Sequence, residues 1–587
     1  MIYLGIYVGH NASAALMHEG RIIFALQEER FTNIKNFYGY PAKSIDHCLK
    51  YAKSKKVKID IAAFATINNP IFFWKYRINN FFSISDYEKY YSVSLNNNKA
   101  ISFVKNHKRS KDNMGFYLPY NKVNKKNYFN AKFAREMLKT HLKKQAKETI
   151  KKIIFLDHHT CHAYYSYYSS KKRKDKSCIV SIDSYGDEAN QSIWIANKGK
   201  LKLVAKTNQF EIARIYKFIT LILGMKPDEH EFKVMGLSAY SKKKYIIEVY
   251  NKVFKNIQKF DGVKIIHKHR PKNLYKFLKE ASKNVRFDNL AGGLQYFVEK
   301  IIEDLLIRIY KKYKIRNYYF SGGVAMNVKM YNNLGKLKFV NFLYSPPSGS
   351  DESISIGACY YLSKNIKTHP LNNIYLGKNL LNKNEKLNLD LLKKNFSKNN
   401  FQIINNFSHE HLAKLLAKNK VIAVARDREE FGARALGNRS IIANPSNYDV
   451  VQNINESIKN RDFWMPFALT ILKENHKKYI KNKKNFECSY MTMSFDTTKN
   501  NYHKIKAGCH PYDRTVRPQI LEKSTNPKYY SIIKHFLKKT GIPALLNTSL
   551  NLHGSPMASS LQQVIYTFKN SDLNYLYIND NYLIKKK

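Results

Sequence analysis

The stretch Ile2-Tyr-Leu-Gly-Ile-Tyr-Val-Gly-His-Asn11 decides the fold of this chain, because its layout occurs twice. An apolar strand runs into a polar turn that contains glycine, and two further strands follow, joined by a tight turn. Residues 2–26 have this layout, and residues 178–206 repeat it around the polar turn Asp183-Ser-Tyr-Gly-Asp187. Apolar runs bounded by short turns of this composition indicate hairpins. We therefore expect two copies of one hairpin unit.

A duplicated hairpin unit is the layout of the actin-like ATPase fold, in which paired turns face a nucleotide across a cleft. Two unrelated meanders are the alternative, because hairpins of this length are common. With 587 residues the chain is too long for one core. The predicted fold class is α/β: an actin-like domain at residues 1–365 with a helical insertion at about 75–150, a linker region at 366–395, and a second α/β domain at 396–587.

The chain is strongly basic, with 101 Lys and Arg against 44 Asp and Glu and a formal net charge of +57. Such a charge can attract nucleic acid or an anionic surface. Here the excess is spread along the sequence and rises together with Asn, Ile and Tyr, which indicates the codon bias of an AT-rich genome. We therefore expect small anionic substrates and no nucleic-acid partner.

The six cysteines are scattered without Cys-x-x-Cys spacing, which argues against a disulfide framework and a structural zinc site. The apolar start of the chain is too short for a signal peptide, and no apolar run is long enough to span a membrane. These features predict a cytoplasmic protein without a membrane span. A homodimer is a possible assembly that these features neither predict nor exclude.

A candidate metal site begins with His158 and His162, which lie four residues apart. On a helix both imidazoles would leave the same face and could share one metal ion. Asp183 ends an apolar, strand-like run, and Asp351 lies in a loop rich in Gly, Ser and Pro. Two histidines with one or two carboxylates suit iron(II), with zinc and manganese as alternatives. A solvated or core-packed helix is the other reading of the histidine pair.

A second set of candidate residues is basic and lies in the second domain. In strand-like stretches, alternation would put Lys459 and Arg461 on one side, and likewise Ser549 and Asn551. Arg binds phosphate through two hydrogen bonds and Lys acts as a point charge, so such a set could hold a triphosphate or an acyl phosphate. For any single cation the alternative is solvated surface.

Two further features point to phosphate binding. Arg434 and Arg439 lie among Gly, Ala and Leu, where a surface would not ordinarily carry two guanidinium groups. In Tyr318-Tyr-Phe-Ser-Gly-Gly-Val-Ala-Met-Asn327 a strand runs into two glycines. The backbone N–H groups of such a turn can approach a phosphate or a ribose.

Together these residues resemble the carbamoyltransferase family of the NodU and CmcH type, which includes nodulation-factor and antibiotic O-carbamoyltransferases. The resemblance spans nearly the whole chain. It rests on Gly9–Ser13, Asp157–Ala163, Asp183–Asp187, Lys233–Leu237, Ser321–Asn327, Arg434–Ser440, the pair Lys459 and Arg461, and the pair Ser549 and Asn551. It implies a first domain of actin-like fold, similar to the tRNA-modifying threonylcarbamoyl transferase, and a second domain similar to YrdC.

The resemblance also implies a reaction. The second domain would bind carbamoyl phosphate and Mg-ATP, release phosphate and form carbamoyl adenylate, using Lys459, Arg461, Ser549, Asn551, Arg434, Arg439 and Arg517. The first domain would transfer the carbamoyl group to a hydroxyl of a sugar, polysaccharide precursor or secondary metabolite. Its site would combine a metal on His158, His162, Asp183 and Asp351 with the cofactor-binding residues Gly322, Gly323 and Asn327.

His10 is the candidate for taking the proton of the acceptor hydroxyl. The alternative is that His10 has only a structural role, as a cap of its turn. Four residues depart from the family pattern: Asn11 stands for Asp, Ser184 and Ser353 for Gly, and Met465 for Arg. Asn11 affects the predicted activation of the acceptor, and Met465 affects the predicted phosphate site.

Two alternative functions remain open. One is a threonylcarbamoyl transferase that acts on tRNA, and the other is a nucleotide-binding module that has lost acceptor chemistry.

Overall fold

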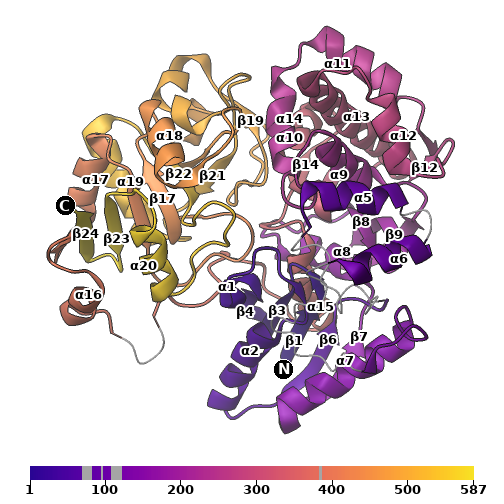
Figure 1. The fold of residues 1–587 in the computed structure, drawn as a ribbon, viewed down its shortest axis with the longest axis horizontal. Helices are drawn as coiled ribbons and strands as arrows, with labels where there is room; N and C mark the ends of the chain where they lie inside the picture. Colours follow the sequence, from indigo (N-terminus) through magenta and orange to yellow (C-terminus); the bar gives the residue numbers. More distant parts are fainter. Residues whose placement is uncertain (69–81, 94–96, 108–121, 382–385) are drawn as a thin grey trace. The chain divides into compact units, whose positions relative to one another are not determined.

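The computed structural model describes residues 1–68, 82–93, 97–107, 122–381 and 386–587 (Figure 1). They form two compact units. The first comprises Met1–Thr32 and Asn36–Leu371, and the second comprises Asn33–Lys35 and Asn372–Lys587. Sheets and helices occur in both units, so the chain is α/β, as the sequence predicts.

The first unit contains two five-stranded sheets with the same strand order. The first sheet is β4 (Arg21–Gln27), β3 (Ser13–His18), β1 (Ile2–Tyr7), β6 (Ile59–Phe64) and β7 (Ile150–Phe155). The second is β10 (Lys200–Thr207), β9 (Ala189–Asn197), β8 (Ser177–Gly186), β13 (Asn317–Ser321) and β14 (Phe342–Tyr344). In each sheet an antiparallel meander is extended by two strands parallel to its first strand. This repeated order confirms the predicted duplication, and the first unit is a duplicated actin-like domain.

A pair of helices lies between the two sheets. α8 (His158–Ser169) packs against β8 and β13, α15 (Ile354–Leu362) packs against β1 and β3, and the helices pack on each other. Glycine permits this packing, because a Cβ on Gly357 would lie 1.9 Å from the carbonyl oxygen of Cys161. A Cβ on Gly5 of β1 would lie 1.8 Å from the carbonyl oxygen of Ser355. The position of α8 is therefore set by direct backbone contact.

The other described helices of the first unit include three in the predicted insertion, α5 (Ile84–Val93), α6 (Asn97–Asn106) and α7 (Ala131–Ala146). The insertion's residues 75–81, 94–96 and 108–121 lie outside the described residues. The remaining helices are α1 (Glu29–Thr32), α2 (Ala42–Ser54), α9 (Ile212–Ile222), α10 (Glu231–Leu237), α11 (Lys243–Val249), α12 (Leu274–Ala281), α13 (Phe287–Tyr313) and α14 (Val328–Lys336).

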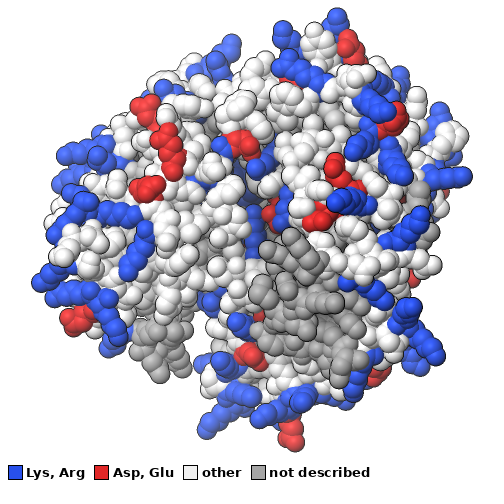
Figure 2. All heavy atoms as spheres, viewed as in Figure 1, with Lys and Arg blue, Asp and Glu red and all other residues white. Residues whose placement is uncertain are grey.

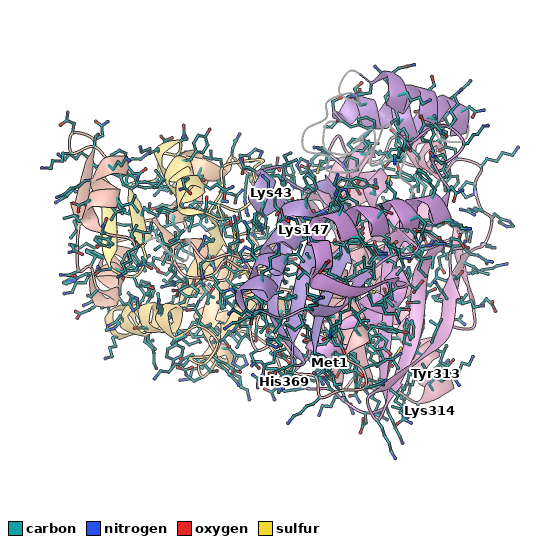
Figure 3. The ribbon with its side chains drawn as sticks, turned by 90° about the horizontal axis from the view of Figure 1, so that it is seen from below. Met1, Lys43, Lys147, Tyr313, Lys314 and His369 are labelled. Carbon is teal, nitrogen blue, oxygen red and sulfur yellow. The ribbon has the colours of Figure 1, made fainter. Side chains whose placement is uncertain are left out.

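The end of the first unit returns to its start. The backbone N–H of His369 donates to the carbonyl oxygen of Gly20, in the turn between β3 and β4. The neighbouring Glu19 N–H donates to the carbonyl oxygen of Met1. Figure 3 accordingly shows Met1 and His369 close together. The segment that leaves the first unit is thus held against the first hairpin.

The second unit is built on one mixed sheet of eight strands. In order these are β15 (Phe401–Ile404), β24 (Tyr582–Lys586), β23 (Tyr575–Ile578), β16 (Ile422–Ala425), β17 (Arg439–Ala443), β22 (Ala544–Ser549), β18 (Ala468–Leu472) and β21 (Pro518–Leu521). Its helices are α16 (Leu389–Asn395), α17 (His409–Ala417), α18 (Asp449–Ile454), α19 (Pro527–Thr540) and α20 (Leu561–Lys569). Apolar side chains of α18 and α20 pack with those of the sheet into one core.

Short two-stranded pairs complete the described strands. They are β2 (Gly9–His10) with β5 (Tyr38–Gly39), β11 (Gln258–Asp261) with β12 (Lys264–His267), and β19 (Phe495–Asp496) with β20 (Thr515–Val516).

All six cysteines are buried and unpaired. Within the described ranges, every helix is too short or too polar to cross a membrane. Figure 2 shows Lys and Arg spread over the visible face rather than gathered in one patch.

Replacing Gly357 with alanine is expected to destabilise the first unit strongly, because the added methyl group would lie 1.9 Å from a carbonyl oxygen. Overpacking of such a contact costs about 3 kcal/mol. Gly199→Ala is the control, since its turn has open space and only its φ of +75° opposes the change, at about 1 kcal/mol. Urea unfolding followed by circular dichroism measures both free energies. Equal losses in the two variants would contradict the close-packing explanation.

Candidate metal centre and anion site

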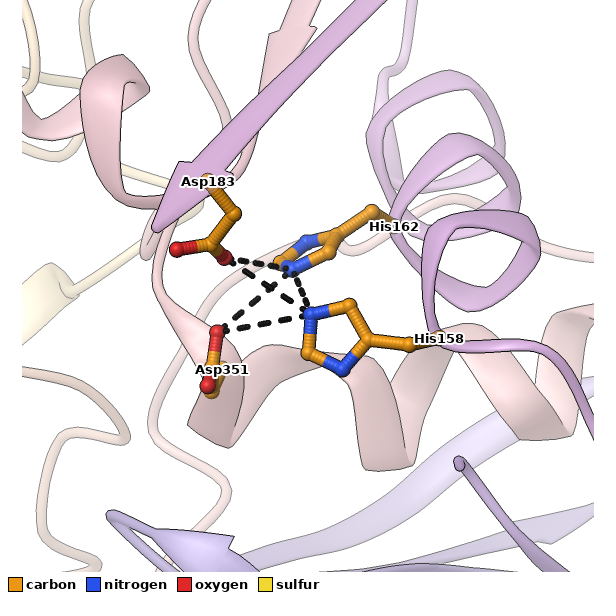
Figure 4. Close-up of side chains that lie close together, drawn as sticks. All are labelled: His158, His162, Asp183 and Asp351. Atoms are coloured by element: carbon orange, nitrogen blue, oxygen red, sulfur yellow. Dashed lines mark hydrogen bonds and ion pairs between the residues drawn. The ribbon is translucent and has the colours of Figure 1, made fainter. Parts of the chain in front are cut away.

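Four side chains of the first unit converge on one point (Figure 4). α8 supplies His158 and His162 from one face, as predicted from their spacing. Asp183 comes from β8, and Asp351 comes from the short 3₁₀ turn η6 (Asp351–Ser353) just before α15. Asp157 begins α8 by accepting a hydrogen bond from the Thr160 N–H at 2.8 Å, a typical N-cap. The sequence prediction therefore named a set that the fold brings together.

The separations of the four donor atoms fit a metal ion. His162 Nε2 lies 3.1 Å from His158 Nε2 and 3.2 Å from Asp183 Oδ2. His158 Nε2 lies 3.7 Å from both Asp183 Oδ2 and Asp351 Oδ1, and His162 Nε2 lies 3.6 Å from Asp351 Oδ1. Four ligands bonded at about 2.1 Å in a tetrahedron would be about 3.4 Å apart. Two imidazole nitrogens and two carboxylate oxygens are suitable ligands for a divalent transition metal.

Hydrogen bonds behind three of these four side chains hold their orientation. His162 Nδ1 lies 2.8 Å from Ser321 Oγ, the Tyr7 hydroxyl donates to Asp351 Oδ2 at 2.6 Å, and the Ser184 N–H donates to Asp183 Oδ1 at 2.6 Å. In metal sites such partners fix the ring orientation of histidines and the direction of carboxylates. The oxygens and nitrogens not engaged in this way are the ones that point at the centre.

At this centre, burial and the neighbouring charges shift the pKa values of the side chains in opposite directions. Burial lowers the pKa of His158, but the charges of Asp351 and Asp183 outweigh it and raise that pKa to about 9. For Asp183, burial raises the pKa, but hydrogen bonds from His158 and His162 hold it well below its usual range. These opposite shifts favour an imidazolium–carboxylate pair between His158 and Asp183. A metal ion bound at this centre would compete with that proton.

The predicted glycine turn lies beside the metal candidate. Gly322 has a φ of +86°, and a Cβ there would lie 2.3 Å from the carbonyl oxygen of Ile182. A Cβ on Gly323 would lie 3.2 Å from Asp183 Oδ1. Asn327 caps α14 and also donates to Gln295 Oε1 at 2.9 Å, so its amide is engaged inside the protein. The cofactor-binding roles of these three residues stay predictions.

His10 lies in β2, opposite Tyr38 of β5. Burial raises the pKa of Tyr38, and the negative charge of Asp351 adds to the effect, so this tyrosine lies within electrostatic range of Asp351. Sequence analysis missed Tyr38, Tyr7 and an ion pair between Lys217 Nζ and Asp228 Oδ2 at 2.5 Å.

Asp228 belongs to the same part of the first unit as His10. Burial raises its pKa, but the charges of Lys217 and His10 outweigh burial and lower it. The charge-rich loop Gly224-Met-Lys-Pro-Asp-Glu-His-Glu231 was the sequence signal that could have revealed this pair. The acceptor-proton role of His10 stays a prediction.

The second unit brings together three predicted residues. Lys459 Nζ donates to Asn551 Oδ1 at 2.7 Å and to Ser549 Oγ at 3.2 Å, and Ser549 Oγ donates to Asn551 Oδ1 at 2.5 Å. Ser549 ends β22, as the strand pattern predicts, while Asn551 lies beyond the strand. Lys459 is buried. The three side chains form one compact polar cluster.

The expected strand at Lys459 and Arg461 is wrong. Lys459 ends a π-helical turn, η7 (Asn455–Lys459), closed by a hydrogen bond from the Asn460 N–H to the Asn455 carbonyl oxygen. Asn460 then takes a left-handed conformation with a φ of +43°. This turn, not strand alternation, sends both cations to the same region, where Arg461 donates to Thr548 Oγ1 at 3.2 Å. A left-handed Asn is a common helix end.

Three arginines and two lysines crowd this region. Burial lowers the pKa of Arg517, and the charges of Arg434 and Arg461 lower it further. Burial and Arg434 together lower the pKa of Arg461 to about 10. Burial and then Arg461 lower the pKa of Lys459, with a further contribution from Lys35, a residue that sequence analysis missed. Mutual repulsion among cations of which Lys459 is buried and the others are half-buried indicates a site suited to an anion.

Arg439 does not join this group, contrary to the prediction. Its side chain is fully buried in β17. Its N–H groups donate to the backbone carbonyl oxygens of Arg426, Asp427, Asn438 and Ser559. These five hydrogen bonds use all the donors that a guanidinium has. Arg439 supports the Arg434–Ser440 segment from inside and has no N–H left for a phosphate.

Comparisons with known proteins agree with this division into two parts. The family model described as Carbamoyltransferase N-terminus matches residues 3–360, and Carbamoyltransferase C-terminus matches residues 413–586. The uncharacterized protein MJ1051 of Methanocaldococcus jannaschii is 31% identical over 99% of each chain. Nodulation protein NolNO of Sinorhizobium fredii is 25% identical, over 98% of this chain and 79% of that protein.

Among solved structures, component A of the (R)-2-hydroxyglutaryl-CoA dehydratase of Acidaminococcus fermentans aligns with 62% of this chain and 97% of its own. The sequence identity is 11% and the TM-score is 0.33, so the fold assignment rests on strand order alone. The two family models, in contrast, match consecutive parts of the chain that hold the candidate metal centre and the cation cluster. The chain belongs to the carbamoyltransferase family and is an enzyme of that kind.

Proposed function

We propose that this carbamoyltransferase uses carbamoyl phosphate and ATP to form carbamoyl adenylate, and transfers the carbamoyl group to a hydroxyl of a sugar, polysaccharide precursor or secondary metabolite. The observation that carries the proposal is the set of buried and half-buried cations around the Lys459–Asn551 hydrogen bond. ATP, carbamoyl phosphate and pyrophosphate are all anions that such a site would stabilise. Unpaired buried cysteines fit a reducing cytoplasm.

In this proposal the second unit activates the carbamoyl group. Water hydrolyses carbamoyl phosphate to carbamate and inorganic phosphate, and a carbamate oxygen then attacks the α-phosphorus of Mg-ATP. A bond from carbamate to phosphorus forms while the bond to pyrophosphate breaks. Arg461 and Arg517 would balance the phosphate charge, and Lys459, oriented by Ser549 and Asn551, would hold the reacting anion. Positioning and charge neutralisation are the main tools for phosphoryl chemistry.

The first unit would then carry out the transfer. His158, His162, Asp183 and Asp351 would hold a divalent metal, with iron(II) as the first candidate, and such an ion would polarise the carbonyl group. The acceptor oxygen forms a bond to the carbonyl carbon, the bond to AMP breaks, and the acceptor proton passes to His10.

Replacing Lys459 with methionine is expected to lower the rate of carbamoyl adenylate formation by about a hundredfold or more, because a positioned charge on the reacting anion is lost. Methionine keeps most of the buried volume of the lysine stem. The matched control is Lys528→Met in the same unit, whose ammonium pairs with Asp427 at 2.8 Å and lies outside the cation cluster. Mass spectrometry of reactions with ATP, carbamoyl phosphate and Mg²⁺ measures carbamoyl adenylate and pyrophosphate.

The same assay separates the alternatives. Unchanged product formation in the Lys459 variant would remove Lys459 from the reaction. No carbamoyl adenylate with the unaltered protein would reject the proposed activation step. An adenylate formed from threonine and bicarbonate instead would favour the threonylcarbamoyl transferase reading.

Replacing His162 with alanine is expected to abolish metal binding, because one imidazole ligand of the cluster is lost. The control is His159→Gln on the same helix. His159 is also buried, but burial and the charge of His158 lower its pKa to about 3, and it lies outside the convergent set. We expect about one metal ion per chain in the unaltered protein and in the control. Elemental analysis after anaerobic purification gives the stoichiometry, and full metal content in the His162 variant would refute this ligand set.

A further inference from the structure

One buried carboxylate links three parts of the first unit. Asp187 lies in the turn between β8 and β9. It accepts hydrogen bonds from the backbone N–H of His158 at 2.7 Å and of Asn68 at 2.7 Å. It also accepts from the Thr66 hydroxyl and from the Ile67 N–H, both at 2.9 Å. Asp187 is 7% exposed, so these bonds are sheltered from water.

The donors come from elements that the candidate metal centre must hold together. The His158 N–H opens α8, the helix that carries both histidines. Thr66, Ile67 and Asn68 follow β6 of the first sheet, one residue after its end. Asp187 itself follows Asp183 by four residues, so the same β8 turn carries a candidate ligand and this carboxylate. One side chain thus ties the first sheet, the ligand helix and the ligand strand to each other.

The neighbouring residue shows how closely the turn fits the histidine. A Cβ on Gly186 would lie 2.3 Å from Cδ2 of the His158 ring. The turn backbone therefore lies directly against the imidazole, while Asp187 holds the backbone of the same residue. Both the ring and the main chain of His158 are located by this turn.

We propose that Asp187 is a positioning residue of the metal centre, which holds the two histidines and Asp183 at ligand separations before metal binds. This inference rests on the proposed metal centre. Hydrogen bonds to a charged carboxylate are stronger than neutral ones, and a carboxylate at a helix N-terminus is favoured by the helix dipole. Loss of a residue that orients ligands typically weakens metal binding 10- to 100-fold.

Asp157 provides the comparison that separates positioning from ordinary helix capping. It also lies at the start of α8, where it accepts hydrogen bonds from Thr160 and pairs with Lys206 Nζ at 2.6 Å. These bonds connect the start of α8 only to its own first turn and to an exposed lysine. They do not connect it to the segment after β6 or to the β8 turn that carries Asp183. Both aspartates stabilise the helix start, but only Asp187 reaches Thr66–Asn68.

The test compares Asp187→Asn with Asp157→Asn. Asparagine keeps the shape of aspartate and caps helices well, so the change is mild at position 157. At position 187 both carboxylate oxygens accept hydrogen bonds, so the new NH₂ group would face an N–H donor. Co²⁺ serves as the probe, its Kd is measured by competition with a chromophoric chelator, and melting temperatures are measured in EDTA.

We expect the Kd for Co²⁺ to rise at least tenfold in Asp187→Asn and to stay within threefold of the unaltered protein in Asp157→Asn. A Kd for Asp187→Asn within threefold of the unaltered protein would overturn the inference while leaving the metal centre intact. If the unaltered protein bound no Co²⁺, the metal centre itself would fail, and the inference with it.

A second variant keeps the test decisive if Asp187→Asn does not fold. Thr66→Val removes one of the hydrogen bonds to Asp187 and leaves the backbone donors in place. We expect a weaker but measurable rise in the Kd for Co²⁺, of about threefold or more, because the carboxylate loses one of its anchors to the first sheet. An unchanged Kd in a folded Thr66→Val protein would then count against the inference.

Discussion

The close approach of α8 and α15 is the constraint on which the first unit depends. The two backbones meet at Gly357, and α15 lies directly against β1 at Gly5, because any side chain at either position would overlap a carbonyl oxygen. α8 carries both histidines, and Asp351 lies immediately before α15. The backbone packing of these two helices therefore brings ligands from distant parts of the chain to one point, where carboxylates and imidazoles then hold each other by charge.

The second unit depends on the opposite electrostatic situation. Its cluster gathers like charges around the buried Lys459, and partial removal from water together with mutual repulsion lowers the pKa values of Lys459, Arg461 and Arg517. An anionic substrate would relieve that repulsion, which is the physical reason for proposing that phosphates bind here. Arg439 shows that a buried arginine need not belong to such a site. Backbone carbonyl oxygens take all its donors, and it serves the fold instead.

The two sites supply different chemistry, and the proposed reaction needs both. Making a reactive carbamoyl donor requires cations that neutralise phosphates, whereas transferring it to a hydroxyl requires polarisation of a carbonyl group and removal of a proton. A carbamate is a poor acyl donor until its oxygen becomes part of a better leaving group. Separate sites let each step have its own electrostatic environment, cationic for the phosphates and mixed imidazole–carboxylate for the transfer.

The sequence by itself determined the duplicated hairpin unit, the α/β class and the four side chains of the candidate metal centre. Apolar runs, the composition of the turns between them, and the spacing of His158 and His162 are local patterns that can be recognised without knowledge of the fold. Only the tertiary structure decided that Lys459 follows a π-helical turn, that Arg439 is saturated by carbonyl oxygens, and that Asp187 joins two sheets and a helix. Each of these depends on which buried donor meets which acceptor across long stretches of chain, and local sequence does not encode such partners.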